Sequence, residues 1–356
     1  MTEYRLMGWA EALATHRAEW LAVGIDRQLN PTLLPDWTEI IAETLADPST
    51  VRVLAGTRDG KLTGLIPFRI RTDRMRGFPV RILEPISSIL AYHAEFACQE
   101  DPTGLLNALL RSRAELPWEF MRLAGILSDS DTARAIGTVA MENGCGLVRW
   151  PGESSPVLPI AATGESLLNG RDKRDRYQIR RHAKDFDATA GSECRWYEDG
   201  SDVAGLIQAM LHVEAGSWKQ KAGVAISARP TETSYYERLL PWLASTGQLL
   251  ANVLWINGEP VAYCLCNKWQ DRYGCMKGTY REEFARLAVG HHAQDQLILR
   301  AADTGALEFD FLGDADPYKL SWSPRTRQHD DYFLYAPSGP GRWLGLAQRL
   351  HERLRR

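Results

Sequence analysis

Residues 249–269, LLANVLWINGEPVAYCLCNKW, contain two apolar runs that are separated by Asn257-Gly258. A two-residue Asn-Gly connection between apolar runs is the strongest short-range signal for a β-hairpin. The next run, RYGCMKGTY at 272–280, is typical of a third strand. This stretch therefore predicts an antiparallel meander at the centre of a domain.

A similar plan occurs earlier in the chain at an offset of 198 residues, which superposes Asp59-Gly60 on Asn257-Gly258. The same offset aligns Trp20 with Trp218. Upstream of each hairpin, matching residues recur at helical spacing: Trp37, Glu39, Ile41, Leu45 and Ala46 match Tyr235, Glu237, Leu239, Leu243 and Ala244. Each half is thus predicted to run from helix to hairpin, as expected of a duplication.

The division between the copies is predicted near residue 151, because RWPGESSPVLPI at 149–160 has the proline and glycine content of a linker. We expect an N-terminal domain at 1–150 and a C-terminal domain at 151–336. The segment 337–356 has leucines at 344, 346, 350 and 354 among basic residues, which predicts a terminal amphipathic helix. A chain of 356 residues is long enough for two hydrophobic cores.

Composition limits the possible partners. The net charge is −3, so any polyanion site must be local. The N-terminus has no export-signal pattern, and the chain lacks the run of roughly 18 apolar residues that a spanning helix needs. We expect a cytoplasmic protein with no membrane partner.

The six cysteines at 98, 145, 194, 264, 266 and 275 do not form the two close pairs of a zinc site. We expect buried, reduced thiols and no metal.

Residues 171–186, RDKRDRYQIRRHAKDF, form the first of four stretches suited to chemistry. From residue 171 to 184 seven Lys/Arg stand against two Asp, a local charge of +5. On a helix Lys173, Arg176, Arg180 and Lys184 share one arc with Arg181 at its edge, while Ile179, Ala183 and Phe186 form an apolar stripe. A solvated basic face and a site for a phosphate-bearing ligand are both consistent with this pattern.

The second stretch, HVEAGSWKQKAGVAI at 212–226, places Glu214, Trp218 and Lys219 just before a glycine-containing loop. An acceptor-binding loop needs an aromatic wall, an orienting charge and a flexible turn. The alternative is a core tryptophan among surface charges.

In the third stretch a strand leads through REEFARLAVG to a helix that begins near Gly290. Free N–H groups at such a helix start favour a phosphate, and Arg286 would add a charged donor. The fourth stretch, LEFDFLGDADPYKLSWSP at 307–324, predicts a strand on which Leu307, Phe309 and Phe311 share one face. Asp310 lies on the other face, and Tyr318, Lys319 and Trp322 follow.

Together these stretches resemble the GNAT superfamily over residues 165–325, and within it the CelD-like (cellulose-biosynthesis-protein-type) acyltransferases. Fem-type transferases have the same tandem arrangement. The resemblance rests on KRDRYQIRR, on SWK at 217–219, on the Asn257-Gly258 hairpin and on FDFLGDADPYKLSW. It implies an α/β (α+β) fold of tandem GNAT-like domains, each a mixed, mostly antiparallel sheet flanked by helices.

The resemblance also implies an acyl-CoA cosubstrate, acetyl-CoA or another acyl-CoA. Its pantetheine arm would follow the strand that includes Lys277 and Gly278, and its pyrophosphate would bind at the helix start. The expected coenzyme contacts are Lys277, Gly278, Arg286, Val289, Gly290, His291 and His292. Relatives commonly have Ser-Pro-Gly before this helix, whereas this chain has Ala288-Val289-Gly290.

Acyl transfer to an amine requires a base, an oxyanion donor and an acid for the leaving thiolate. Lys319 resembles the lysine of Fem-type enzymes and is the candidate donor to the oxyanion or to a substrate carboxylate. Asp310 or Glu214 is the candidate base, and Tyr280 or Tyr318 the candidate acid. His291 and His292 are further possible bases, although a His pair at a helix start also suits a cap. Acceptor contacts are assigned to Arg180, Arg181, Trp218, Lys219 and Trp322.

The leading hypothesis is acyl-CoA-dependent N-acylation of an amine on a small molecule or sugar, with the chemistry in the second half. The first half has Leu21 where the second has Lys219, and it lacks the Asp-Phe-Leu-Gly…Tyr-Lys run, so we expect it to be degenerate. Two alternatives stay open: an aminoacyl-tRNA-dependent Fem-type transferase, the only case in which nucleic acid is expected, and a non-catalytic GNAT-like binding module.

Overall fold

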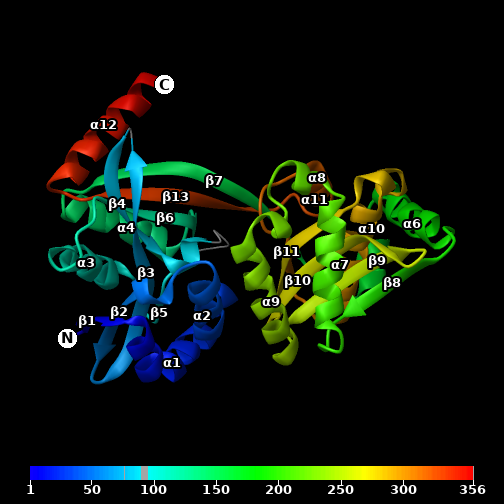
Figure 1. Cartoon of the computed structure of the whole chain (residues 1–356), viewed down its shortest axis with the longest axis horizontal. Coiled ribbons are helices and arrows are strands. Elements are labelled where there is room, and N and C mark those ends of the chain that lie inside the picture. Colours follow the sequence, from blue (N-terminus) through cyan, green and yellow to red (C-terminus); the bar gives the residue numbers. More distant parts are fainter. Residues whose placement is uncertain (76, 90–94, 356) are drawn as a thin grey trace. The chain divides into compact units, whose positions relative to one another are not determined.

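The computed structural model describes residues 1–75, 77–89 and 95–355. The chain divides into two compact units, which consist of residues 1–154 with 327–356 (unit 1) and of residues 155–326 (unit 2). In each unit helices flank a mixed, mostly antiparallel sheet (Figure 1). The predicted fold class is confirmed.

Unit 1 has the strand order β1-β2-β3-β4-β6-β13-β7, with β5 added to β3. β4 and β6 are parallel, with Ile82 opposite Phe120. Its strands are β1 Glu3–Gly8, β2 Arg52–Arg58, β3 Lys61–Met75, β4 Phe78–Pro85, β5 Ala97–Cys98, β6 Phe120–Leu127, β7 Gly146–Pro159 and β13 Thr326–Tyr335. Its α-helices are α1 Trp9–Asp26, α2 Pro35–Thr44, α3 Thr103–Arg111, α4 Asp131–Glu142 and α12 Pro340–Arg355.

Unit 2 repeats this order as β8-β9-β10-β11-β12 followed by the end of β7. Here β11 and β12 are the parallel pair. Its strands are β8 Ser192–Tyr197, β9 Leu249–Ile256, β10 Glu259–Trp269, β11 Arg272–Tyr280 and β12 Glu308–Asp310. Its α-helices are α5 Gly164–Asn169, α6 Lys173–Asp187, α7 Val203–Ala215, α8 Trp218–Lys221, α9 Pro230–Ser245, α10 Val289–Asp303 and α11 Pro317–Trp322.

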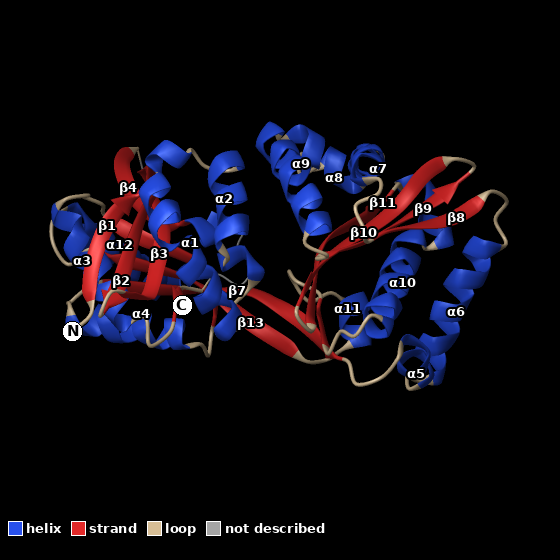
Figure 2. Ribbon diagram, turned by 90° about the horizontal axis from the view of Figure 1, so that it is seen from below, coloured by secondary structure: helices blue, strands red, loops and turns tan. Residues whose placement is uncertain are grey.

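The helices of unit 2 lie on both faces of its sheet. α7, α8 and α9 lie on one face, and α5, α6, α10 and α11 on the other (Figure 2). The main core forms where α10 packs its apolar side on β10 and β11, around residues such as Val261, Ala293 and Leu297. This core fixes the start of α10 relative to the end of β11.

Both predicted hairpin turns are present. Asp59 and Gly60 have φ of 52° and 76°, and Asn257 and Gly258 have φ of 51° and 81°. Positive φ at both positions is the type I′ geometry that matches the twist of the flanking strands. The helix that precedes each hairpin is also present, as α2 and α9.

The segment predicted as a linker or domain crossing passes from unit 1 to unit 2, and it does so as a strand. β7 runs from Gly146 to Pro159 through the three prolines. Its end pairs with β12, and the carbonyl oxygen of Pro156 accepts from the N–H of Phe311 at 3.0 Å. Partners far away in sequence keep this proline-rich segment extended, and a local pattern does not contain them.

The C-terminal part of the chain also differs from the predicted division. Residues 327–336 were expected in the second domain, whereas β13 lies between β6 and β7 in unit 1. The predicted terminal helix is α12. Arg356 and the side chains of residues 347 and 349–355, including the predicted leucines 350 and 354, lie outside the described residues.

Two predicted faces need correction. Leu307 was predicted to share one face of a strand with Phe309 and Phe311, but it is exposed while those two are buried, and Asp310 on the other face is buried as well. β12 has only three residues and begins at Glu308, so Leu307 lies just outside the strand and does not take part in its alternation. On α6, Ile179 and Phe186 are buried as predicted, and so is His182, which the apolar stripe did not include.

Candidate active site in unit 2

β11 and β12 part shortly after they begin. β12 pairs only with Arg272, Tyr273 and Gly274, whereas β11 continues for six more residues, to Tyr280. On its other side β11 stays paired with β10 as far as Tyr280. Residues 275–280 of β11 therefore have one strand edge that β12 does not cover. This stretch includes Lys277 and Gly278, the residues predicted to contact the coenzyme.

This edge leads to the start of α10. The residue before the helix, Ala288, has a left-handed φ of 52°, and no side chain caps the helix. Uncapped N–H groups and the helix dipole favour an anion at this position. Arg286 lies just before it in the 3-10 turn Glu282–Leu287.

Gly290 has a packing role that the sequence did not reveal. A Cβ at this position would lie 2.4 Å from Cδ1 of Tyr280, so the tyrosine ring occupies the space of a side chain. The predicted acid Tyr280 and the predicted phosphate site are thus adjacent. Val289 is fully buried and anchors the helix start in the core.

His291 and His292 differ in their surroundings. The His291 ring stacks on Tyr318 with centroids 4.2 Å apart, and the His292 ring lies 5.1 Å from that of Phe186. Burial lowers the pKa of both histidines, although Asp295 opposes it. His291 is exposed, whereas His292 is buried and is not the surface cap that a His pair at a helix start suggested.

Glu214, at the end of α7, is the centre of a buried charge cluster on the face of the sheet that lies opposite α10. Its carboxylate accepts hydrogen bonds from the hydroxyl of Tyr263 at 2.6 Å and from the N–H of Ile226 at 2.6 Å. The ammonium groups of Lys219 and Lys277 lie 3.3 and 3.5 Å from the same carboxylate oxygen. Lys219 also donates to the carbonyl oxygen of Gly278 at 3.0 Å.

One carboxylate shared by two ammonium groups explains the electrostatics of this cluster. Burial alone would raise the pKa of Glu214, but Lys219, Lys277 and the donated hydrogen bonds outweigh it, and the pKa lies below its ordinary value. Burial lowers the pKa of Lys219, and the neighbouring charge of Lys277 adds to this effect against the opposing pull of Glu214. Glu214 is therefore ionised, and because the ammonium of Lys277 also lies 3.8 Å from the carboxylate of Glu232, two ammonium groups face two carboxylates in this cluster.

The structure gives Lys277 a different setting from the predicted one. Its ammonium faces Glu214 and lies 5.5 Å from the centroid of the Tyr236 ring. It thus belongs to the same cluster as the predicted acceptor residue Lys219.

Lys319 and Asp310 organise the loop after β12. Lys319 donates to the carbonyl oxygens of Leu312 and Asp314, both at 2.9 Å. Asp310 accepts from the hydroxyl of Ser155 at 2.8 Å and from the N–H of Leu312 at 2.9 Å. Leu312 has a positive φ of 45°, so these contacts hold a backbone conformation that leucine rarely adopts.

Sequence reasoning missed Asp295, which is fully buried on α10. Its carboxylate accepts from the Tyr318 hydroxyl at 2.5 Å and from the indole N–H of Trp322 at 3.2 Å, and His182 lies at 3.4 Å. These contacts join α6, α10 and α11. The only sequence signal was an aspartate at helical spacing from Ile298 and Ala302, and its partners His182, Tyr318 and Trp322 lie on other helices.

Tyr318 and Trp322 therefore have packing roles. Burial and Asp295 raise the pKa of Tyr318 well above its ordinary value. The indole of Trp322 is buried beneath the guanidinium of Arg171, which lies 4.2 Å from the ring centroid.

The basic helix α6 is capped at its N-terminus by Asp172, whose carboxylate accepts a hydrogen bond from the N–H of Asp175 at 2.8 Å. Arg180 and Arg181 are exposed; Arg180 donates to the side chain of Asn169 and Arg181 faces Asp185 at 3.7 Å. Both thus remain accessible to a phosphate-bearing ligand.

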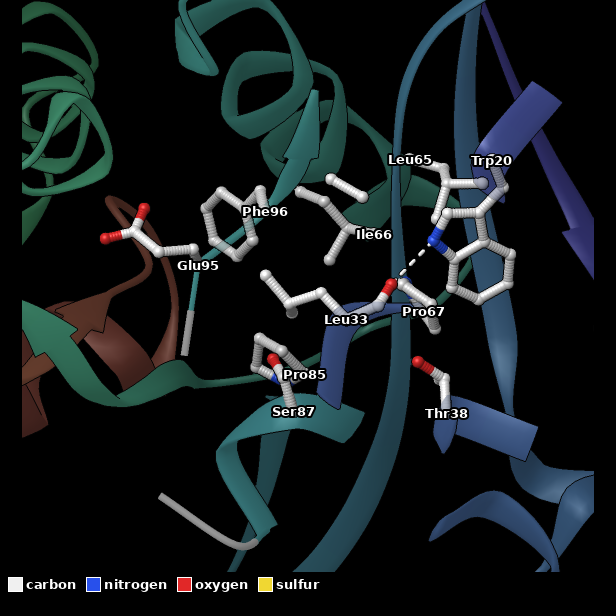
Figure 3. Close-up of a pocket in the computed structure, with 11 residues that line it drawn as sticks. Trp20, Leu33, Thr38, Leu65, Ile66, Pro67, Pro85, Ser87, Glu95 and Phe96 are labelled. Atoms are coloured by element: carbon white, nitrogen blue, oxygen red, sulfur yellow. Dashed lines mark hydrogen bonds between the residues drawn. The ribbon is translucent and has the colours of Figure 1, made fainter. Parts of the chain in front are cut away.

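The two aligned tryptophans have different environments. Trp218 is 51% exposed on α8, whereas Trp20 is 1% exposed and donates to the carbonyl oxygen of Leu33 at 2.7 Å. Trp20 lines a small pocket in unit 1 together with β3 residues such as Leu65 and Ile66 (Figure 3). Its cavity volume of about 10 Å³ has room for a single water molecule.

Within the part of the chain that the structure describes, no group of three or more His, Cys, Asp or Glu is arranged to hold a metal ion. The six cysteines are free thiols. Among the described helices none is long and apolar enough to span a bilayer.

Comparison with known proteins agrees with this geometry. A family model described as an acetyltransferase (GNAT) domain matches residues 173–320. Residues 173–320 of unit 2 are therefore similar to an acetyltransferase (GNAT) domain, and the repeated strand order of unit 1 gives the chain the fold of a tandem GNAT protein.

Three solved structures illustrate the likeness. FemX is 15% identical, with a TM-score of 0.59 over 94% of this chain and 97% of that chain. L-PGS from Bacillus licheniformis is 11% identical, with a TM-score of 0.55 over 95% and 97%. A tandem GNAT protein from the clavulanic acid biosynthesis pathway is 10% identical, with a TM-score of 0.53 over 95% and 99%. Such identities establish the fold, and the CelD-like branch stays a prediction.

No curated protein matches this sequence.

Proposed function

We propose that unit 2 transfers an acyl group from an acyl-CoA, such as acetyl-CoA, to an amine of a small molecule or sugar. The observation that carries this proposal is the parting of β11 from β12, which leaves an open strand edge leading to the uncapped start of α10. A strand edge can hydrogen-bond an extended chain with amide groups, such as a pantetheine arm. A helix start favours the pyrophosphate that follows this arm.

In the proposed reaction the amine nitrogen attacks the thioester carbonyl carbon, the C–S bond breaks and an amide forms. A base takes the proton of the amine, and the leaving thiolate takes a proton from an acid. Tyr280 is the proposed acid, because its ring lies against Gly290 where the strand edge meets the helix. Tyr318 is less suited, because its proton is donated to Asp295.

Glu214 is the proposed base, acting through water, because its side chain is ionised but fully buried. Lys219, which contacts Glu214 and the carbonyl oxygen of Gly278, is the proposed group that orients a carboxylate or phosphate of the acceptor, beside the exposed Trp218. Asp310 is not proposed as the base, because its carboxylate accepts hydrogen bonds from Ser155 and from the N–H of Leu312. Lys319 uses two of its N–H groups to hold the same loop, and we propose that its third N–H group donates to a substrate oxygen.

An aminoacyl-tRNA donor is the second candidate, and one observation favours it: α6 exposes Lys173, Arg174, Arg180, Arg181 and Lys184. Phosphates of RNA would meet such a surface. The net charge of −3 argues against an extended RNA interface.

Calorimetry with acetyl-CoA, longer acyl-CoAs and deacylated tRNA tests both candidates. We expect acyl-CoA binding in the micromolar range and thiol release with amine acceptors. Lys319→Ala is expected to lower turnover with little change in coenzyme affinity. Arg180→Ala/Arg181→Ala is expected to weaken the binding of a phosphate-bearing ligand, and equal affinity would leave this helix as a solvated basic face. Absence of heat with every acyl-CoA would overturn the proposal, and tRNA binding that the double variant abolishes would favour the alternative.

A further inference from the structure

One face of unit 1 collects exposed aromatic side chains. Among the described residues of unit 1, the large apolar side chains exposed on this face are Phe78, Trp150, Trp343 and Leu346. Trp343 is 73% exposed and Phe78 72% exposed. We call this surface the α12 face.

Strand alternation and packing place these residues together. Val80, Ile82, Phe120, Val148 and Tyr335 form a small core, and Met75 and Leu344 pack against it. Phe78 shares the face of Val80 on β4, and Trp150 shares the face of Val148 on β7, because every second residue of a strand lies on one side. The tip of the β3–β4 hairpin therefore lies beside α12, as Figure 1 also shows.

α12 has two apolar sides. Gly341 and Gly345 allow the helix to approach Ala336 and Tyr335, where an added Cβ would lie 2.9 Å from the nearest atom of either residue, and Leu344 packs on the small core. This side attaches the helix to the sheet. Trp343 and Leu346, three residues apart, lie on an exposed side that packing within unit 1 does not require.

The charge of this segment indicates what covers the exposed side. Residues 340–356 contain five arginines and one glutamate, a local charge of +4 in a chain with a net charge of −3. Two copies of this chain meeting through α12 would bring together two segments that each carry a charge of +4, and like charges repel. An anionic surface satisfies both the arginines and the aromatic side chains, since tryptophan prefers the boundary between water and lipid.

We propose that the α12 face of unit 1 docks on the surface of an anionic lipid bilayer, with Trp343, Phe78 and Leu346 inserted at headgroup depth. This contact is peripheral, and it revises the expectation that the protein has no membrane partner. It does not depend on the proposed function of unit 2.

Sedimentation of the full chain with vesicles tests this proposal. Vesicles of phosphatidylcholine with phosphatidylglycerol should bind the protein at low salt, and binding should fall in about 0.5 M NaCl, where charges are screened. Vesicles of phosphatidylcholine alone should bind it at least ~tenfold more weakly, because basic residues near an anionic leaflet each add to affinity. Trp343→Ser/Leu346→Ser and Phe78→Ser should each reduce binding to the anionic vesicles.

Met141→Ser is the matched control. Met141 is 78% exposed in α4, whose buried residues pack in a different core of unit 1. Its loss should leave binding unchanged. If circular dichroism shows that the serine variants are misfolded, quenching of tryptophan fluorescence by brominated lipid is measured instead. The variant Trp343→Phe should then lose part of this quenching.

Three results would overturn the proposal: no binding of the original chain to anionic vesicles, equal binding by Trp343→Ser/Leu346→Ser and Met141→Ser, or quenching that Trp343→Phe leaves unaltered. A concentration-dependent dimer that Trp343→Ser/Leu346→Ser dissociates, without vesicle binding, would assign the face to self-association instead.

Discussion

At the scale of single residues, Glu214 has the most constrained setting in unit 2. Its two carboxylate oxygens meet a hydroxyl, a backbone N–H and two ammonium groups while the side chain is fully buried. Removing one partner from such a group leaves charges buried without compensation, which costs more than the contact itself contributes.

Glu214→Gln is therefore expected to lower the free energy of unfolding by about 3 kcal/mol, because the largely buried ammonium of Lys219 loses its carboxylate and Lys277 loses one of its two. Urea unfolding followed by circular dichroism measures this loss. Glu193→Gln is the matched control, since Glu193 forms an exposed pair with Arg195 and such pairs contribute about 0–1 kcal/mol. Equal losses in the two variants would contradict the assigned role.

The lowered pKa of Glu214 predicts a pH dependence with a definite sign. Its folded-state pKa lies below the ordinary value of 4.5, so as the pH falls the unfolded chain binds a proton first. The stabilisation is complete at neutral pH and is lost as the pH falls below that ordinary value toward the folded-state pKa. The stability difference between the original chain and Glu214→Gln should shrink as the pH falls below the ordinary value of 4.5, and parallel stability curves would exclude this linkage.

At the scale of elements, the contact between β11 and α10 controls the proposed coenzyme site. Gly290→Ala would place a Cβ 2.4 Å from the Tyr280 ring. We expect a loss of about 1–3 kcal/mol in stability from overpacking, together with weaker acyl-CoA binding in calorimetry.

Gly137→Ala provides the control for this glycine, because nothing lies within 4 Å of an added Cβ in the middle of α4. Alanine there should be neutral or stabilising by about 0.5–1 kcal/mol. If the affinity of Gly290→Ala for acyl-CoA is unchanged, the contact between Tyr280 and Gly290 is not part of the coenzyme site.

Elements were predictable where their signal is local. The Asn257-Gly258 and Asp59-Gly60 turns and the helices α6 and α10 follow from turn chemistry and from 3.6-residue periodicity. β7 was not predicted as a strand, because its partners β13 and β12 follow only after another 150 residues or so of chain. The Asp295 contacts were missed for the same reason, since they join three helices.

At the scale of the whole molecule, the chain returns to unit 1 after completing unit 2. β13 lies between β6 and β7, and Phe120–Leu127 of β6 pairs with it. The fold of unit 1 therefore depends on residues near the C-terminus.

A chain that ends at residue 325 should lose the fold of unit 1 even though residues 1–154 are intact, because β6 loses its backbone partner in the sheet. Hydrogen exchange of β6 peptides measures this effect, and exchange should rise strongly. A chain that ends at Gly339 keeps β13 and lacks only α12, so its β6 peptides should stay protected. Protection of β6 in the shorter chain would show that unit 1 folds without β13.

By itself the sequence determined the helix-and-hairpin plan of each half and the segments of unit 2 that carry charge, because these depend on spacing within some 20 residues, while the α/β class followed from the resemblance to a known family. Only the tertiary structure decided that Lys277 joins Lys219 at Glu214, that Asp295 holds Tyr318, and that β7 and β13 complete sheets far from their neighbours in sequence. Such contacts depend on the packing of distant segments, which leaves no periodic trace in the chain.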